Sequence, residues 1–370
     1  MSLDVITQEL KSTGVKFDLS NYEALEITKM KSELDDYLSV LSEKLGQTLY
    51  LDNLILIYQL LSDNGIFVPD LSQEYLKKHQ YDCEELYLLY KAKDIQQKLR
   101  TYSVDKLKSC MDENGRIHGE WYRANATTGR LICRNPALQG LPSSIRKEYM
   151  IPEKGNVFVT ADYSTVEMRV LAKLANDENL IKNLGTGCDI HSKTASVIYD
   201  KPMKDVTHEE RQVAKGVNFM IAYGGTSLGL SRKLTIETGN EVSESQAKKM
   251  IDNFYSEFSD VYYYHYQLLH KKILPTTLKG RVYENLSGSK ALNYPVQASA
   301  AEGFIDTLDE IIRTKPDEYR LVMCIHDSVT LEVPESDATN STNFLKSTAE
   351  RVMGDFIYPV PVFAEIKNYI

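Results

Sequence analysis

Apolar residues recur at helical spacing through the first hundred positions. Residues 25–45, 51–61 and 75–99 each place apolar side chains three and four positions apart, which predicts three amphipathic helices. Gly65, Pro69 and the polar pair Asp63-Asn64 interrupt the pattern between them. We therefore expect the N-terminal part of the chain to be helical.

The pattern changes after residue 110. Residues 111–156 hold many glycines and prolines, which favours extended and looped chain. Beyond them, short apolar runs typical of strands alternate with helical spacing. We expect strands at 157–161, near 277–284 and within 321–333, and helices at 166–175, 243–272 and 293–313. This mixture predicts an α+β fold.

Composition places the chain among globular proteins. Its 42% hydrophobic and 26% charged residues exclude a disordered or collagen-like class, and 370 residues suffice for two or three subdomains. The longest apolar run, residues 54–61, is too short to span a membrane, and no secretory signal opens the chain. The five cysteines form no C-x-x-C pair, so we expect neither a disulfide framework nor a cysteine zinc site and favour a cytoplasmic location.

The net charge of −9 disfavours nucleic acid as a partner, but its distribution changes that picture. Residues 1–110 carry −5, residues 301–370 carry −7, and residues 111–300 carry +3. An acidic average can hide a basic groove in the middle of the chain. Charge alone therefore permits nucleic-acid binding without indicating it.

An aspartate follows the strand expected at 157–161. Asp162 ends an apolar run, at the edge of a sheet where side chains converge on a ligand rather than on the core. Ser164 and Glu167 then have the spacing of a capping box, which would begin the helix expected at 166–175. Glu167 is either that cap or a functional carboxylate, and the motif alone does not decide between them.

A second aspartate lies between the two strands expected within residues 321–333. The turn His326-Asp327-Ser328 places Asp327 at a hairpin tip, although aspartate is common in turns for local reasons. Two strand-end carboxylates in one sheet, Asp162 and Asp327, could hold two Mg²⁺ ions, which prefer oxygen ligands. Such ions, about 3.5–4 Å apart, stabilise both the attacking and the leaving oxygen of a phosphoryl transfer.

Residues 207–225 predict a helix with two chemically different faces. Thr207 and Glu210 form a capping box, and Gly224-Gly225 provides a C-terminal stop. One face spans roughly 120° and carries two cations followed by two aromatic rings, which suit a triphosphate and a base in linear order. These residues are Arg211, Lys215, Phe219 and Tyr223, with Val213, Val217, Met220 and Ile221 on the opposite face. An ordinary amphipathic helix with buried aromatics is the alternative.

The looped stretch 119–152 contains an arginine among small residues. Thr128-Gly129-Arg130-Leu131 allows the close approach of a sugar–phosphate backbone or a minor groove. A surface loop with an ion pair would have the same composition.

Together, and in this order, the segments resemble the family A DNA polymerases. D-Y-S-x-x-E-x-R at 162–169 is similar to the family's motif A, R-x-x-x-K-x-x-x-F-x-x-x-Y-G at 211–224 to motif B, and H-D at 326–327 to motif C. Four further blocks at 128–139, 189–191, 277–281 and 293–297 resemble the family's T-G-R-L with P-x-L-Q, D-I-H, T-L-x-G-R and N-x-P-x-Q. The resemblance extends in blocks over about residues 110–333.

The resemblance implies a right-hand polymerase with an antiparallel-sheet palm, helical fingers and a helical thumb. Its boundaries would be thumb 1–118, palm 119–185 and 276–370, and fingers 186–275. It also implies template-directed extension of a primer 3′-OH with dNTPs by two-metal nucleotidyl transfer. The partners would be primer–template DNA, dNTPs and separate replication proteins such as an exonuclease, with no membrane.

Site residues follow from the same resemblance. Two Mg²⁺ ions, with Mn²⁺ as a substitute, would bind Asp162, Asp327 and the carbonyl of Tyr163. The triphosphate, sugar and base would be contacted by His191, Arg211, Lys215, Phe219, Tyr223 and, as a steric gate at the 2′ position, Glu167. Lys215 would also neutralise, or donate a proton to, the pyrophosphate. Arg130, Asn293, Gln297 and His326 would lie along the DNA.

Two features depart from the family pattern. Motif C of the family usually ends in Glu, whereas this chain has Ser328, as single-subunit RNA polymerases do. Tyr163 and Glu167 of the motif A segment nevertheless favour DNA synthesis. Too few residues precede the helical part for a 3′–5′ exonuclease, so we expect no proofreading and a minimal polymerase of the kind found in phages or mobile elements.

Two other kinds of function compete with this prediction. An RNA-making or primer-independent polymerase of the same fold is favoured only by Ser328. A non-catalytic DNA-binding factor would have no need of both aspartates and Lys215. A dinucleotide-binding enzyme lacks support, because no G-x-G-x-x-G follows an expected strand.

Overall fold

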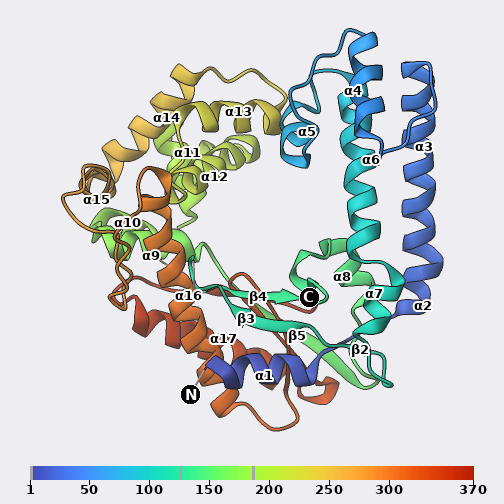
Figure 1. Ribbon diagram of the computed structural model, residues 1–370. Coiled ribbons are helices and arrows are strands. Elements are labelled where there is room, and N and C mark those ends of the chain that lie inside the picture. Colours follow the sequence, from blue (N-terminus) through green and yellow to red (C-terminus); the bar gives the residue numbers. More distant parts are fainter. Residues whose placement is uncertain (1–2, 125–126, 186–187) are drawn as a thin grey trace. The chain divides into compact units, whose positions relative to one another are not determined.

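The computed structural model describes residues 3–124, 127–185 and 188–370, and the chain forms two compact units (Figure 1). One unit comprises Met1–Glu9, Trp121–Ile132 and Lys154–Tyr369, and we call it the sheet unit. The other comprises Leu10–Glu120 and Cys133–Glu153, together with Ile370, and we call it the helical unit. The described residues contain no helix that is both long and apolar enough to cross a membrane.

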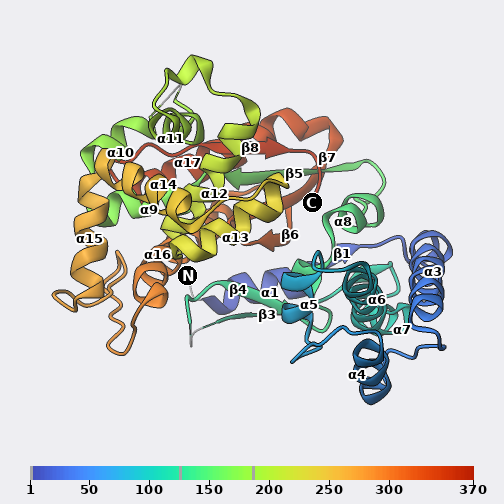
Figure 2. The same cartoon turned by 90° about the horizontal axis from the view of Figure 1, so that it is seen from above.

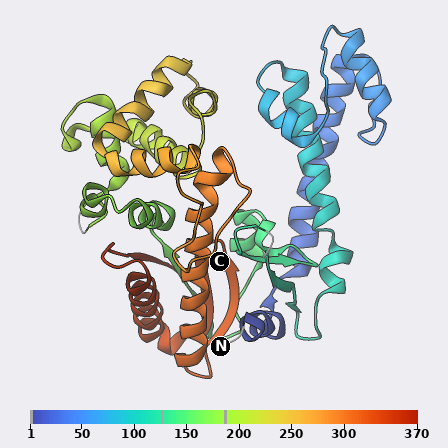
Figure 3. The ribbon, with the colours of Figure 1, turned by 60° about the vertical axis from the view of Figure 1, so that its left-hand side comes forward.

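Two long helices dominate the helical unit. Helices α3 (Thr28–Leu45) and α6 (Glu84–Thr101) lie side by side, with the shorter α4 (Leu54–Asp63) and α5 (Gln73–His79) near one end (Figures 1 and 3). Their apolar faces form one core that includes Leu41, Ile57, Leu61 and Leu89, each excluded from solvent. The helices predicted at 25–45 and 51–61 are thereby confirmed, the first preceded by a short π-helical segment, Tyr22–Ile27.

The prediction of a single helix at 75–99 is wrong, because the structure has two helices there, α5 and α6. Asp82 N–H donates to the carbonyl of His79, and the Asp82 carboxylate contacts His79 Nδ1 at 2.7 Å. Cys83 then adopts extended backbone, with φ −157° and ψ 165°, before α6 begins. Apolar spacing continues on both sides of this turn, so periodicity cannot detect it.

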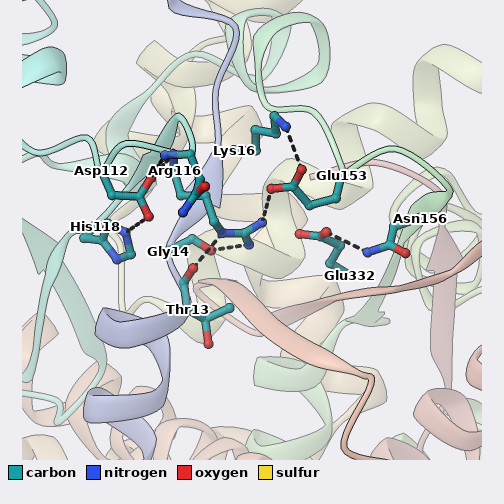
Figure 4. A network of polar contacts seen from close by, with 10 residues as sticks. Thr13, Gly14, Lys16, Asp112, Arg116, His118, Glu153, Asn156 and Glu332 are labelled. Carbon is teal, nitrogen blue, oxygen red and sulfur yellow. Dashed lines mark hydrogen bonds and ion pairs between the residues drawn. The ribbon is translucent and has the colours of Figure 1, made fainter.

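Short elements at the other end of α3 and α6 are joined by a buried arginine (Figure 4). Arg116 donates to the carbonyls of Thr13 at 2.7 Å and Gly14 at 2.9 Å, and to Glu153 Oε1 at 3.1 Å. Lys16 donates to the other oxygen of Glu153 at 2.6 Å. The short elements of the helical unit are β1 (Val15–Lys16), α2 (Leu19–Asn21), α7 (Val104–Ser109), β2 (Arg116–Ile117), η2 (Leu138–Gly140) and α8 (Ser143–Tyr149), while most of α1 (Leu3–Thr13) belongs to the sheet unit. Helix α8 lies within the stretch 111–156 that we predicted to be loops.

A four-stranded antiparallel sheet forms the centre of the sheet unit. Its strand order is β6 (Arg320–Ile325), β7 (Ser328–Pro334), β5 (Asn156–Tyr163) and β8 (Ala364–Lys367). The strands predicted at 157–161 and within 321–333 are confirmed. Helices α16 (Ser289–Thr314), which includes the predicted 293–313, and α17 (Ala338–Phe356) pack together, and α17 contacts β5, β7 and β8 (Figure 2).

The two faces of this sheet differ because side chains alternate along each strand. On one face, Val159 of β5 lies opposite Leu331 of β7, and both are buried. On the other face, the hydroxyls of Thr160 and Thr330 lie 2.8 Å apart. Tyr163 belongs to the apolar face, where its hydroxyl donates to Ala349 O of α17 at 2.8 Å. Its neighbour Asp162 therefore points from the opposite, polar face.

A group of helices completes the sheet unit, and α9 connects it to the sheet region through contacts with α10, α12, α15 and α16. Its members are α9 (Val166–Ala175), α10 (Glu178–Asn183), α11 (Ile190–Tyr199), η3 (Met203–Asp205), α12 (His208–Ala222), α13 (Ser227–Thr238), α14 (Glu244–Glu257) and α15 (Ser259–Leu269). The helix predicted at 166–175 and the helical region at 243–272 are confirmed. A hairpin of β3 (Glu120–Arg123) and β4 (Leu131–Arg134) and the short η4 (Glu335–Asp337) also belong here.

The strand pair predicted near 277–284 is wrong. Only one isolated bridge, between Thr276 and Val282, occurs there. Gly280 N–H donates to Thr277 O, and the Thr277 hydroxyl donates to Glu302 of α16 at 3.0 Å. The segment is thus a tight turn whose two arms share the backbone hydrogen bonds Thr277 N–H to Arg281 O and Tyr283 N–H to Pro275 O, without forming regular strands.

Candidate active site

One cavity of about 930 Å³ in the sheet unit gathers the predicted site residues. It is lined by residues of β5, α9, α11 and α12 and by the turn between β6 and β7. All the predicted residues except Asn293 and Gln297 line it: Arg130, Asp162, Tyr163, Glu167, His191, Arg211, Lys215, Phe219, Tyr223, His326 and Asp327.

Asp162 and Asp327 come together because of strand register. Asp162, next to the end of β5, lies directly opposite Ser328, the first residue of β7. Asp327 immediately precedes Ser328 in the turn, after His326 in the left-handed region at φ 56°. Burial, and next the Asp162 carboxylate, raise the pKa of Asp327 to about 7. The two carboxylates are therefore close enough to repel each other measurably.

The donor set at this position suits a hard cation. Asp162 has a second neighbour on the same face, Glu365 of β8, and both line the cavity with Asp327. Among residues 3–124, 127–185 and 188–370, no group of three or more His, Cys, Asp and Glu side chains converges to hold a metal ion. At phosphoryl-transfer sites Mg²⁺ usually binds through one or two carboxylates, substrate phosphates and water.

Helix α12 presents the predicted face of cations and rings to the cavity. Its capping box is confirmed, since the Thr207 side chain accepts from Glu210 N and the Glu210 side chain accepts from Thr207 N. The opposite face is buried as predicted: Val213, Val217 and Ile221 are all 8% exposed or less, although Met220 is only partly buried. The helix ends where Gly224 turns at φ 63°, and a Cβ there would lie 2.8 Å from Leu292 Cβ.

Three aromatic rings form a row in the cavity. The Phe219 ring lies 6.2 Å from the Tyr223 ring, nearly parallel at 26°, and 6.3 Å from the His191 ring. Lys215 Nζ lies 5.9 Å from the centre of the Phe219 ring. These rings line the cavity, and Phe219 and Tyr223 are partly exposed. The structure therefore does not support the alternative in which the aromatic side chains of α12 are buried in the core.

Arg211 makes a two-pronged ion pair with Asp189, the N-cap of α11. Arg211 Nε lies 2.6 Å from Asp189 Oδ2, and Nη2 lies 3.1 Å from Oδ1. Asp189 also accepts from Ser192 N–H at 3.1 Å. Burial opposes the charge of Asp189, but the hydrogen bonds from Arg211 and Ser192 outweigh it and lower the pKa to about 2. A guanidinium held in this way faces the cavity in a fixed orientation.

Burial keeps His191 neutral, and a buried asparagine orients its ring. Burial lowers the pKa of His191 to about 4. The Thr194 hydroxyl donates to Asn218 Oδ1 at 2.9 Å, so the Asn218 amide nitrogen faces His191 Nδ1 at 2.8 Å. This nitrogen can only donate, which leaves the ring proton of His191 on Nε2. His191 is therefore a neutral hydrogen-bond donor in the cavity.

Glu167 does not form the predicted capping box with Ser164. Helix α9 begins after Thr165, which has φ 54° and makes no side-chain cap. The Glu167 carboxylate instead forms a close ion pair with Arg130. Burial, and next Glu167, raise the pKa of Tyr223 to about 12. Glu167 is thus held by Arg130 from the β3–β4 hairpin and by Tyr223 from α12, and only 8% of it is exposed.

Asn293 and Gln297 lie on α16, outside the residues that line the cavity. Both are partly buried, and Asn293 Nδ2 is a buried donor with no partner among the described residues. The start of α16 lies against the end of α12, because Gly224 closely approaches Leu292 and Ser289.

Several residues that shape the site were not predicted as site residues. Asp189 orients Arg211, Asn218 orients His191, and Lys367 forms a close ion pair with Asp162 Oδ2. Asn218 carried little signal, because at about 100° per residue it lies near the direction of Arg211, at the edge of the cationic face of α12. The sequence contains no local signal for Lys367, because its partner Asp162 lies 205 positions away in the chain.

Comparisons with known proteins agree with this geometry. A sequence model described as DNA polymerase family A matches residues 27–368. DNA polymerase I of Chloroflexus aurantiacus is 32% identical over 293 residues, which cover 73% of this chain and 30% of that protein. DNA polymerase I of Bacillus subtilis is 28% identical over 374 residues, covering 91% of this chain and 41% of that protein.

A solved structure also matches. The polymerase domain of Pol1 from M. smegmatis, in complex with a DNA primer–template and a dNTP, has a TM-score of 0.80 and 25% sequence identity. The match covers 99% of this chain and 69% of the solved one. It supports the predicted α+β fold. The chain spans between 30% and 47% of the length of the Chloroflexus and Aquifex relatives it matches.

Proposed function

The chain belongs to DNA polymerase family A, and from that premise we propose that it extends a primer 3′-OH with dNTPs on a DNA template. One observation carries the proposal: Asp162 and Asp327 share a cavity with the cation-and-ring face of α12. The relatives named above are DNA polymerases, and the solved neighbour holds primer–template DNA and a dNTP. None of them supports RNA synthesis.

We propose that two Mg²⁺ ions, replaceable by Mn²⁺, bind Asp162, Asp327 and the Tyr163 carbonyl. The oxygen donors fit divalent cations, and so does the raised pKa of Asp327, which comes first from burial and next from the charge of Asp162. Bound there, such ions supply charge for the attacking and leaving oxygens of an in-line transfer. Tyr163 fixes the backbone at this point through its buried hydroxyl.

The triphosphate would lie along the first half of α12 and against α11. Arg211 offers the guanidinium N–H groups that Asp189 does not occupy and Lys215 an exposed ammonium, both suited to phosphate oxygens. The neutral His191 ring donates a hydrogen bond from Nε2–H to a phosphate oxygen and adds no charge to the site. As the bond to the leaving pyrophosphate breaks, Lys215 neutralises the new charge or transfers a proton to it.

The sugar and base would lie at the second half of α12. Phe219 packs on the nucleoside, and Tyr223 faces the templating base from the next turn. Glu167, held rigidly by Arg130, blocks the 2′ position, so that a ribose hydroxyl meets a carboxylate that cannot move aside. Arg130, Asn293, Gln297 and His326 are proposed to contact the primer–template, and the unpaired Nδ2 of Asn293 is a donor for it.

We further propose that residues 27–368, which match the polymerase model, provide no 3′–5′ proofreading. A primer with a mismatched 3′ end should then persist when dNTPs are withheld. Its shortening by the purified chain would contradict this part of the proposal.

Primer extension tests the function as a whole. The wild-type chain with Mg²⁺ should extend a primer with dNTPs and use rNTPs poorly. Asp162→Ala and Asp327→Ala should each lose extension by at least about 10³-fold, because each removes a carboxylate that would hold the ions. Asp252→Ala, which alters an exposed carboxylate of α14, is the matched control and should keep full activity. Full activity in either site variant would refute the assignment.

A further inference from the structure

Lys367 contacts one of the two carboxylates proposed to bind metal. Its ammonium forms a close ion pair with Asp162 Oδ2. Both side chains are about one-third exposed, at 30% and 31%. The contact lies at the edge of the same cavity, in which Asp162 and Glu365 are lining residues.

The register of β8 explains why a lysine reaches this position. Thr160 lies opposite Lys367 and Asp162 lies opposite Glu365, so all four side chains point from the polar face of the sheet. Lys367 is thereby the diagonal neighbour of Asp162, within reach of its long side chain. The Thr160 hydroxyl donates to Tyr369 O at 2.7 Å, which holds the chain beyond Lys367 against β5.

The ammonium is charged when it makes this contact. A lysine side chain is an ammonium at neutral pH, and its contact with the Asp162 carboxylate favours that charged form. The charged groups that face it are Asp162 and Glu365 on the sheet, with the Tyr369 side chain nearby. Lys367 therefore supplies positive charge where the proposed metal ions would also supply it.

We propose that Lys367 holds Asp162 Oδ2 until a divalent cation displaces it, so that it orients this carboxylate and raises the cation concentration that the site needs. The inference rests on the proposed two-metal site. An ammonium and a divalent cation cannot both contact one carboxylate oxygen without strong repulsion, so cation binding must include the cost of breaking the ion pair. Lys367 is in this sense a positioning residue and not a catalytic one.

The size of the effect follows from the environment of the pair. A partly exposed ion pair contributes modestly, and its replacement also removes the repulsion between ammonium and cation. We expect removal of the charge to tighten divalent-cation binding about threefold to tenfold. A larger change would require full burial, which the 30% and 31% exposures exclude.

Direct Mn²⁺ binding to the 370-residue chain tests the proposal without relying on activity. Free Mn²⁺ is measured by electron paramagnetic resonance during titration of wild type, Lys367→Met, Lys367→Arg and Asp162→Ala. Methionine keeps the length of the side chain and removes its charge, whereas arginine keeps the charge. Lys248→Met, at an exposed ion pair on α14 whose residues do not line the cavity, is the matched control.

Lys367→Met should bind Mn²⁺ about threefold to tenfold more tightly than wild type, while Lys367→Arg and Lys248→Met should match wild type. Unchanged or weaker binding in Lys367→Met, with Asp162→Ala still abolishing the site, would overturn this inference alone. If Asp162→Ala leaves Mn²⁺ binding intact, the proposed metal site itself is wrong and the inference fails with it. Thermal unfolding would reveal a Lys367→Met chain that does not fold. In that case Lys367→Arg becomes the test, and a folded Lys367→Arg chain whose Mn²⁺ affinity differs from wild type would contradict the proposal.

Discussion

Replacing Arg169 should damage both the stability and the activity of the sheet unit. This arginine of α9 is only 5% exposed, and the hydrogen bonds of its guanidinium go to backbone carbonyls. Nε donates to Ser164 O at 2.7 Å, and Nη1 donates to Leu184 O at 2.9 Å and closely to Pro361 O. The guanidinium also lies 5.0 Å from the centre of the Phe363 ring.

The magnitude follows from the groups that would lose their donors. In Arg169→Met the carbonyls of Leu184 and Pro361 would lose this donor, and Ser164 O would keep only the Thr165 hydroxyl, at about 1 kcal/mol or more for each lost hydrogen bond. Loss of the buried charge offsets part of this, because burial already lowers the pKa of Arg169 to about 10. We expect a net loss of about 3 kcal/mol, which lowers the melting temperature of a unit of this size by roughly 6–12 °C.

Thermal unfolding followed by circular dichroism measures this loss. Arg351→Met is the matched control, because that side chain is 54% exposed and pairs with Glu310 on the surface. It should lower the melting temperature by less than about 2 °C. Arg169→Lys should fall between the two, since one ammonium cannot reach three carbonyls. Equal melting temperatures for Arg169→Met and Arg351→Met would refute the reasoning.

Activity should change in the same series. Ser164 directly follows the strand end that carries Asp162 and Tyr163, so Arg169 fixes the backbone beside the proposed metal ligands. Arg169→Lys should therefore lower kcat, with a smaller effect on the KM for dNTPs. A lower affinity for dNTPs at unchanged kcat would show that Arg169 acts elsewhere.

Three further outcomes follow from the site. Glu167→Ala should raise the incorporation of rNTPs relative to dNTPs by about tenfold or more, since the carboxylate at the 2′ position is removed; an unchanged ratio in competition assays would exclude the gate. Phe219→Tyr should incorporate dideoxynucleotides more readily than wild type, because its hydroxyl replaces the missing 3′-OH, and equal chain termination would count against the placement of Phe219. His191→Gln, which keeps a neutral donor, should retain more activity than His191→Ala. Burial lowers the pKa of His191 from 6.5 in the unfolded chain to about 4 in the folded one, so His191 lowers the stability of the fold only as pH falls from 6.5 towards 4. The wild-type pH–rate profile should therefore show no step from His191 above pH 6. A step that His191→Gln removes would contradict the neutral assignment.

Short-range patterns predicted the elements that depend on short-range physics. The capping box of Thr207 and Glu210 is present because both partners lie within one turn of α12. The placement of Asp162 and Asp327 at strand ends followed from two apolar runs, and sheet register then brought them together. In each case the deciding interaction lies within a few residues or along one regular strand.

The misses have long-range causes. Ser164 and Glu167 have the spacing of a cap, but Glu167 is drawn to Arg130, 37 positions away, and Thr165 bends the backbone instead. The partnership of Lys367 with Asp162 depends on the pairing of β8 with β5, which no local pattern specifies. Sequence could therefore supply the main chemical groups of the site, while the residues that hold those groups in place required the fold.

The central claim is that Asp162 and Asp327 jointly bind the cations of nucleotidyl transfer. Crystals of the chain with a chain-terminated primer–template, a matching dNTP and Mn²⁺ test it most directly, because Mn²⁺ is located by its anomalous scattering. We predict two peaks about 3.5–4 Å apart, both contacted by these aspartates and lost together in Asp327→Ala. Peaks bound elsewhere, or two peaks that persist in Asp327→Ala, would contradict the account.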